Sequence, residues 1–332
     1  MKIKVIGCGG AFTEELYHQC FMLSENGRNL FIDYGQQIQP FALKNAGLTV
    51  KDVDEVIITH CHDDHVLSLG MLGLRRYDFI NKPQNCKDTK IPYAPKLIIN
   101  HNLLSEINDI TKGNFRTIEG FVSTLDTFFD VKVLQDNEPY FFEGWKVDMV
   151  QQIHVMTGST VMYSYGVFFE KGDKSFLITS DTQYFQPRQV HYFYKKANLI
   201  ITDCETIGTN FQFQEGEKVY IKDGKPYRYP VQADDPDGMK SLEIMTKGYE
   251  IKDWECFKFM SGVHSSYCEL AGYKSANAMI LSSDIKDKTW LSHYGDHVIH
   301  GVDAFGNKVD WDAQAKKDGF AGFVKLGQVF EV

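Results

Sequence analysis

The sequence predicts an α/β fold in which polar side chains gather where strands end. Short apolar strands recur in both halves of the chain, and segments with helical spacing follow several of them. Of the 332 residues, 43% are hydrophobic, which is enough to fill a large core. We expect a single domain over residues 1–332, because no low-complexity linker or fixed repeat separates two halves.

The first half of the chain is predicted to contain four strands and two helices. The strands are expected at residues 2–7, 20–24, 29–34 and 54–60, and the helices at 37–46 and 66–79. Glu25-Asn26-Gly27 is typical of a tight hairpin turn between the second and third strands. The second helical segment is expected to carry Asp64 and His65 at its start.

The second half repeats the strand pattern and contains a long irregular segment. Strands are expected at residues 145–154, 162–171, 174–181 and 198–205, and the last two end in acidic residues. Residues 81–94 and 206–256 break the order with Pro, Gly, Tyr and charged residues. We interpret both as insertions within the domain.

Composition excludes several classes of protein. With 35 basic and 44 acidic residues the formal net charge is -9, which argues against a broad binding surface for extended nucleic acid. A small anionic ligand held by metal remains compatible with this charge. Absence of a signal-like start, of an apolar run of roughly 20 residues and of paired cysteine spacing favours a cytoplasmic protein without membrane contact.

The segment His60-Cys61-His62-Asp63-Asp64-His65 indicates a metal site. Imidazoles and carboxylates are costly to bury unless each finds a partner, and a divalent ion supplies one. Three histidines and one aspartate are too many ligands for one open catalytic zinc, so two ions are implied. The further ligands that this requires are predicted at other strand ends, namely His154, Asp181 and His293.

This ligand series resembles that of the metallo-β-lactamase superfamily. The resemblance implies a four-layer αββα sandwich with two divalent ions, zinc in the first instance, with manganese or iron as alternatives. It also implies which residues bind each ion: one is held by His60, His62 and His154, the other by Asp64, His65 and His293, and Asp181 bridges them. Asp64 is expected to be essential for catalysis as well as for metal binding.

Further motifs resemble the tRNase Z-like branch of that superfamily. VIGCGGAFT is similar to its glycine turn, and LFIDYGQQIQ to its second strand-turn signature, in which an acidic residue precedes glycine. In that branch a glutamate at a strand end and a later histidine form an acid-base dyad. The resemblance places these roles on Glu205 of DCET and on His264 of VHSSYCELAG.

The whole chain is similar to the anti-Pycsar family of phage and bacterial enzymes, which open cyclic mononucleotides. This resemblance implies a phosphodiesterase that converts 3′,5′-cyclic mononucleotides to 5′-monophosphates, in a phage as a counter-defence enzyme. A hydroxide bridging the metals would attack phosphorus, and His264 would protonate the leaving oxygen. The resemblance also implies a homodimer, in which the Tyr-rich segment 218–230 is either a lid over the site or an insertion without a role.

Three other functions remain open from the sequence. The first is a tRNA 3′-processing endonuclease, which needs a basic surface and an arm that this acidic chain does not clearly show. The second is a non-catalytic metal-binding module, although every predicted ligand position is filled. The third comprises thiol or lactone hydrolases and flavo-iron relatives, which give no reason for Glu205 and His264.

Overall fold

The computed structural model describes most of the chain outside the long insertion. The described residues are 1–81, 94–115, 123–157, 160–182, 187–205, 220–222, 225–227, 264–265, 267–271, 281–302 and 308–332. Most of both predicted insertions therefore lies outside the described residues. The chain divides into two compact units, the first comprising Met1–Val150, Val167–Phe176 and Val324–Val332, and the second comprising Gln151–Gly166 and Leu177–Phe323.

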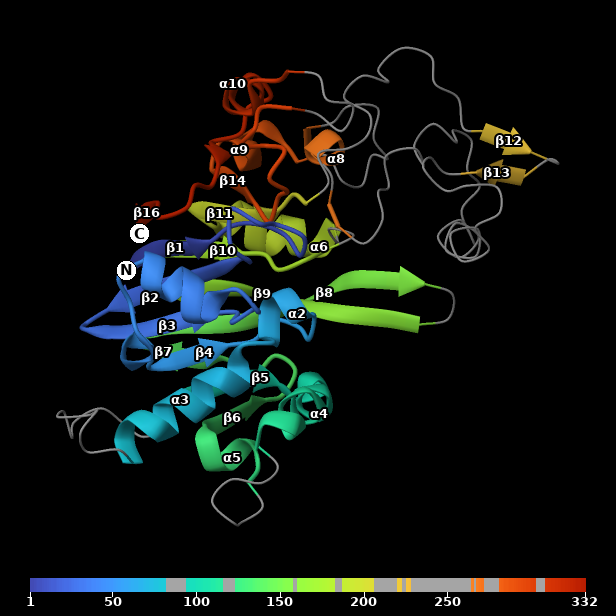
Figure 1. The fold of residues 1–332 in the computed structure, drawn as a ribbon. Coiled ribbons are helices and arrows are strands. Elements are labelled where there is room, and N and C mark those ends of the chain that lie inside the picture. Colours follow the sequence, from blue (N-terminus) through green and yellow to red (C-terminus); the bar gives the residue numbers. More distant parts are fainter. Residues whose placement is uncertain are drawn as a thin grey trace. The chain divides into compact units, whose positions relative to one another are not determined.

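Two seven-stranded sheets form the framework of the fold (Figure 1). The first has the order β16 (Val329–Glu331), β1 (Lys2–Gly7), β2 (Cys20–Glu25), β3 (Arg28–Ile32), β4 (Glu55–Ile57), β5 (Lys96–Asn100), β6 (Asp130–Leu134). The second has the order β15 (Gly322–Phe323), β14 (Thr289–Ser292), β11 (Leu199–Asp203), β10 (Lys174–Ile178), β9 (Thr160–Lys171), β8 (Trp145–Thr157), β7 (Tyr140–Phe142). A separate hairpin pairs β12 (Tyr220–Lys222) with β13 (Lys225–Tyr227).

Helices and helical turns flank the sheets. In the first unit they are η1 (Ile38–Ala42), α1 (Leu43–Asn45), η2 (Val50–Asp52), α2 (Asp63–Val66), α3 (Leu69–Asn81), η3 (His101–Leu103), α4 (Leu104–Phe115) and α5 (Leu125–Phe128). In the second they are α6 (Pro187–Gln189), η4 (Val190–Tyr194), α8 (Tyr267–Ala271), α9 (Ser283–Lys286) and α10 (Trp311–Lys317). The predicted αββα class is confirmed, because two mixed sheets are flanked by helices.

The first sheet changes from antiparallel to parallel pairing at β3. The pairs β1–β2 and β2–β3 are antiparallel, whereas β3–β4, β4–β5 and β5–β6 are parallel. The hairpin between β2 and β3 turns at Asn26 and Gly27, which both have positive φ, as the sequence predicted. Parallel pairing brings the carboxyl ends of β3 and β4 to one edge of the sheet, and the histidine segment begins there.

Contacts inside the first unit show the two sheets facing each other. The indole nitrogen Nε1 of Trp145 in β8 donates to Glu25 in β2 at 3.3 Å. The hydroxyl of Tyr140 in β7 donates to Glu55 in β4 at 2.6 Å, and Glu55 is only 1% exposed. The buried carboxylate of Glu55 therefore has a partner from the opposite sheet, as burial of a charge requires.

Several predicted strands are shorter in the structure than the sequence suggested, and the largest differences include β4 and β10. β4 ends at Ile57 rather than at residue 60, because the backbone and hydroxyl of Thr59 bond to the Asp33 carboxylate. β10 ends at Ile178, so Asp181 lies in the loop after the strand and not within it. In both cases the strand ends before the polar residues begin, and the predicted ligands lie in or beyond the loop that follows.

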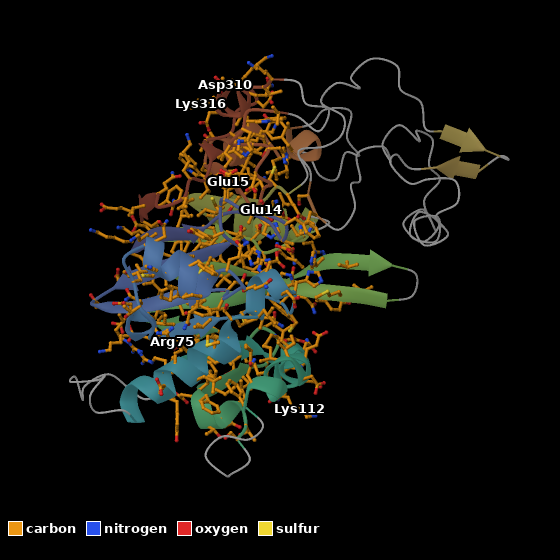
Figure 2. All side chains as sticks on the ribbon, in the orientation of Figure 1. Glu14, Glu15, Arg75, Lys112, Asp310 and Lys316 are labelled. Atoms are coloured by element: carbon orange, nitrogen blue, oxygen red, sulfur yellow. The ribbon has the colours of Figure 1, made fainter. Side chains whose placement is uncertain are left out.

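Charged side chains gather at the surface of each unit. The side chains labelled in Figure 2, such as Arg75 on α3 and Lys316 on α10, are exposed. Among the described residues, no helix is long and apolar enough to cross a membrane.

Candidate metal centre and its histidine network

The first unit presents four of the predicted ligands in one short segment. β4 leads into a loop carrying His60 and His62, and Asp64 and His65 lie in α2. The sequence predicted them at the start of one longer helix, but α2 ends at Val66 and α3 begins separately at Leu69. His60 and His65 are fully buried and Asp64 is 4% exposed, although all three are polar. Ligand atoms of His60 and His62 lie within 4.8 Å of each other, as do those of Asp64 and His65. Short spacing along the chain therefore brings together a compact set of side chains that could hold a metal ion.

Asp33, at the end of β3, supports this set. His65 Nδ1 lies 2.7 Å from Oδ2 of Asp33, and Thr59 donates to the same carboxylate at 2.8 Å from both its backbone nitrogen and its hydroxyl. Burial raises the pKa of Asp33, and the neighbouring His65 and Thr59 offset only part of the rise. The contact fixes the His65 ring with Nε2 turned toward Asp64, 3.3 Å from its Oδ2.

Gly35 explains why glycine follows the acidic residue in this motif. A Cβ atom at Gly35 would lie 1.7 Å from the carbonyl oxygen of Asp64. The loop after β3 therefore packs directly against the backbone that carries the ligands. The sequence identified Asp33 and Gly35 as a family signature, and the structure shows that they hold the ligand segment in place.

The second unit gathers the three remaining predicted ligands from different strands. His154 lies in β8, Asp181 follows β10 and His293 follows β14; none of the three is more than 1% exposed. His154 Nε2 lies 3.5 Å from Oδ2 of Asp181, and His293 Nε2 lies 3.3 Å from its Oδ1. Two atoms bound to one zinc ion at tetrahedral angles, each about 2.1 Å away, lie roughly 3.4 Å apart. These separations therefore fit ligands that share metal ions through Asp181.

The predicted pair of Glu205 and His264 is in contact. His264 Nε2 lies 2.5 Å from Oε2 of Glu205, whose side chain is 19% exposed. The other ring nitrogen, Nδ1, lies 3.1 Å from Asp203 and 3.7 Å from Asp181. Burial alone would lower the pKa of His264, but the carboxylates of Asp203, Asp181 and Glu205 outweigh it and raise the pKa well above its ordinary value. The surrounding carboxylates therefore favour the protonated form of the His264 ring.

The sequence reasoning missed Asp203. It is the last residue of β11 and is fully buried, and it contacts both His264 and His293. Burial would raise the pKa of Asp203, but the two histidines outweigh that effect and lower it. The available signal was the DCE triplet at a strand end, in which only the second acid, Glu205, was given a role.

The structure thus groups the predicted residues into two sets. The first set lies in the first unit and comprises His60, His62, Asp64 and His65. The second set lies in the second unit and comprises His154, Asp181, Glu205, His264 and His293. Buried imidazoles with carboxylates on their second nitrogens are typical of divalent metal centres, so the donor chemistry fits the predicted metal.

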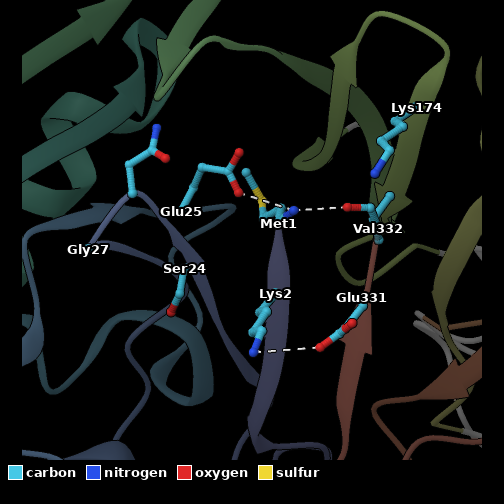
Figure 3. A pocket seen from close by; sticks show the side chains of 9 residues that line it. Met1, Lys2, Ser24, Glu25, Gly27, Lys174, Glu331 and Val332 are labelled. Carbon is cyan, nitrogen blue, oxygen red and sulfur yellow. Dashed lines mark hydrogen bonds and ion pairs between the residues drawn. The ribbon is translucent and has the colours of Figure 1, made fainter.

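A pocket elsewhere in the first unit contains none of these residues. It has a volume of about 480 Å³ and lies between the two chain ends and the β2–β3 turn (Figure 3). The amino group of Met1 donates to the carbonyl of Val332 at 2.8 Å and lies 3.1 Å from Glu25. Lys2 and Glu331, which also line the pocket, form a second ion pair at 3.6 Å.

Comparison with known proteins agrees with the motif analysis. The family model "Anti-Pycsar protein Apyc1" matches residues 1–214. The anti-Pycsar protein of Paenibacillus sp. (strain J14) is 29% identical over 156 residues, which cover 47% of this chain and 59% of that protein. The chain therefore matches somewhat more than half the length of that relative. The anti-Pycsar protein of Bacillus phage vB_BsuM-Goe3 is 23% identical over 305 residues, or 90% of each chain.

Solved structures show the same fold. A metallo-β-lactamase fold protein from Bacillus subtilis aligns with a TM-score of 0.58 and 17% identity, covering 100% of this chain and 98% of that one. The short form of human tRNase Z aligns with a TM-score of 0.57 and 13% identity, covering 100% and 99%. At these identities the likeness concerns the fold alone. The family model covers well over half of the chain, and the chain therefore belongs to the anti-Pycsar Apyc1 family.

Proposed function

We propose that this protein is a metal-dependent phosphodiesterase that hydrolyses 3′,5′-cyclic mononucleotides to 5′-monophosphates. One observation carries the proposal: His264 is held between carboxylates beside Asp181, one of the predicted metal ligands. Phosphodiester hydrolysis needs both a cation at the phosphoryl oxygens and a proton for the leaving oxygen. Membership of the anti-Pycsar family supports the cyclic nucleotide as substrate.

The metal proposal follows the motif series of the superfamily. We propose that His60, His62 and His154 hold one divalent ion, that Asp64, His65 and His293 hold a second, and that Asp181 bridges them. Such ions supply Lewis acidity and lower the pKa of bound water. Zinc suits this mixture of imidazole and carboxylate ligands, with manganese and iron as alternatives.

Residues of the chain itself would then supply a proton to the leaving group. His264 donates its Nε2 proton to the departing 3′ oxygen, which leaves the phosphate on the 5′ carbon. Glu205, 2.5 Å from that nitrogen, accepts the same hydrogen bond before substrate arrives. The two residues form the acid-base pair that the resemblance implied.

A small substrate fits the charge of the chain better than a long nucleic acid does. The formal net charge is -9, and extended nucleic acid is bound through many basic contacts to phosphate. We further propose a homodimer in a single-domain chain, with the Tyr-rich segment 218–230 as a lid. Only the short strands β12 and β13 of that segment lie within the described residues.

Product analysis tests the proposed function. Zinc-loaded protein is incubated with 3′,5′-cyclic AMP, GMP, CMP and UMP, and in parallel with a precursor tRNA that carries a 3′ trailer. We expect 5′-monophosphates from the cyclic nucleotides and none from the Asp64→Ala variant. Trailer cleavage with intact cyclic nucleotides would instead identify an RNA-processing enzyme.

Two measurements cover the remaining parts of the proposal. Metal analysis of purified protein should give about two ions per chain, whereas no bound metal and no turnover would indicate a non-catalytic module. Light scattering coupled to size exclusion should give the mass of a dimer, about twice the 38.0 kDa of one chain. A monomeric mass would remove the lid from the proposal.

A further inference from the structure

Asp203 occupies the centre of the histidine network in the second unit. Because β11 and β14 are parallel with Asp203 opposite Ser292, the Asp203 side chain lies beside His293, the residue after Ser292. The carboxylate Oδ2 is 3.1 Å from His264 Nδ1, a hydrogen-bond distance, whereas Oδ1 makes a longer polar contact of 3.5 Å with His293 Nδ1. One carboxylate therefore faces the same ring nitrogen of two histidines.

Backbone groups hold this carboxylate in one orientation. Oδ2 accepts from the backbone nitrogens of Thr182 at 3.0 Å and Ser265 at 3.4 Å, and Oδ1 accepts from that of Glu205 at 3.1 Å. The hydroxyl of Ser265 in turn donates to the carbonyl of Thr182 at 2.8 Å. These bonds attach the loop carrying His264 to the ends of β10 and β11, so the orientation of Asp203 does not depend on the two histidines.

Glu205 lies on the opposite side of the same ring. It contacts His264 Nε2, the nitrogen that must face the leaving oxygen, and its side chain is 19% exposed whereas that of Asp203 is fully buried. Substrate has to take the place of Glu205 at Nε2, but it leaves the Nδ1 contact intact. Among the described residues, Asp203 is the carboxylate closest to Nδ1, so it can orient His264 while Nε2 faces the substrate.

We propose that Asp203 is the positioning residue that orients both the proton donor His264 and the metal ligand His293 through a single carboxylate. This inference rests on the proposed phosphodiesterase function. It adds the residue that fixes the orientation of the His264 ring relative to the His293 ring. The hydrogen bond from His264 Nδ1 to the carboxylate fixes that ring and its tautomer, and the same carboxylate faces Nδ1 of His293 at 3.5 Å. Asp203 thereby leaves Nε2 of His264 for the leaving oxygen and Nε2 of His293 for the metal.

The loss of kcat in an Asp203 variant should depend on the leaving group of the substrate if Asp203 orients the proton donor, and should not if its role is merely structural. A cyclic nucleotide expels an alkoxide, which needs a proton, whereas bis(p-nitrophenyl) phosphate expels a phenolate, which does not. In Asp203→Asn we expect the kcat for the cyclic nucleotide to fall by roughly 10² to 10³-fold and that for the activated diester by about tenfold or less. Equal losses on both substrates would overturn the proposal.

Asp33→Asn in the first unit is the matched control. Asp33 is also a buried carboxylate beyond a strand end, on Nδ1 of a predicted ligand, His65, but it does not contact His264 in any described interaction. We expect Asp33→Asn to lower metal affinity and to slow both substrates by the same factor. In a His264→Gln background, Asp203→Asn should lose most of its effect on the cyclic nucleotide, because the two residues act together.

A second readout is independent of turnover. In zinc-loaded protein, proton NMR should show a downfield imidazole Nδ1 proton that disappears in His264→Gln and in Asp203→Asn but persists in Glu205→Gln. Persistence of this signal in Asp203→Asn would overturn the proposed role of Asp203, whether or not the protein cleaves phosphodiesters. Absence of phosphodiester cleavage by the wild type would refute the proposed function separately. If Asp203→Asn does not fold, Asp203→Glu, which keeps the charge, replaces it and should retain the signal.

Discussion

The two ligand sets differ in how the chain assembles them. The first set comes from one segment of six residues, held from behind by Asp33 and Gly35. The second set draws on residues between 154 and 293, which lie in β8, after β10, β11 and β14, and ahead of α8. The first set therefore depends mainly on local geometry, whereas the second depends on correct sheet pairing across long sequence separations.

The carboxylates behind the two sets differ in the same way. Asp33 meets one imidazole ring, and its buried charge is offset by too few partners, so its pKa is raised. Asp203 meets two rings, and its pKa is lowered despite complete burial. The first carboxylate therefore contacts one predicted metal ligand, whereas the second contacts a predicted ligand and the proposed proton donor.

Removal of one ligand from each set should produce the largest effect. Asp64→Ala acts on the first set and Asp181→Ala on the second, and we expect each to lower kcat below detection, by about 10⁴-fold or more. Metal analysis by mass spectrometry should show loss of bound ion in both variants. Full metal content with full turnover in either variant would remove that residue from the centre.

His264→Ala should separate catalysis from metal binding within the second set. We expect kcat for a cyclic nucleotide to fall by roughly 10² to 10⁴-fold, because the leaving oxygen loses its proton donor. Metal content should stay at the wild-type value, since His264 faces Asp203 and Glu205 through its two nitrogens. Loss of metal together with activity would instead make His264 a ligand.

Gly35→Ala should test how far the first set depends on local packing. The new methyl group would collide with the backbone of Asp64, and we expect the free energy of unfolding to fall by about 1–3 kcal/mol. Metal affinity should fall as well, measured by competition with a chelator. Gly113→Ala is the matched control, because nothing lies near its Cβ position in α4 and alanine there should stabilise by roughly 0.5–1 kcal/mol.

Glu25→Gln should have the smallest effect, because Glu25 supports the sandwich of the first unit but neither ligand set. Burial would raise the pKa of Glu25, yet Lys171, the amino terminus and Trp145 outweigh it and lower the pKa. Its stabilisation is therefore present above the pKa of the unfolded chain and is lost as pH falls through the lower folded value. We expect a loss of about 0.5 kcal/mol or less in chemical denaturation at neutral pH, and unchanged kcat.

Local patterns in the sequence predicted most of the elements near the first set. β1 has the predicted bounds, the Asn26-Gly27 turn lies where expected, and α2 carries Asp64 and His65. β4 was predicted three residues too long, because the apolar run into Thr59 does not reveal that Asp33 takes its hydrogen bonds. Strand ends are decided by such long-range partners, which periodicity does not contain.

The sequence by itself predicted the residue types of a metal centre, because a dense cluster of imidazoles and carboxylates is costly to bury without a cation. It also indicated Glu205 and His264 as a pair, through their resemblance to a known motif. Only the tertiary structure decided that Asp203 lies on Nδ1 of His264 and Glu205 on Nε2. The physical reason is that strand pairing and loop packing set which carboxylate reaches which ring nitrogen, and residues 61 positions apart carry no local signal of that contact.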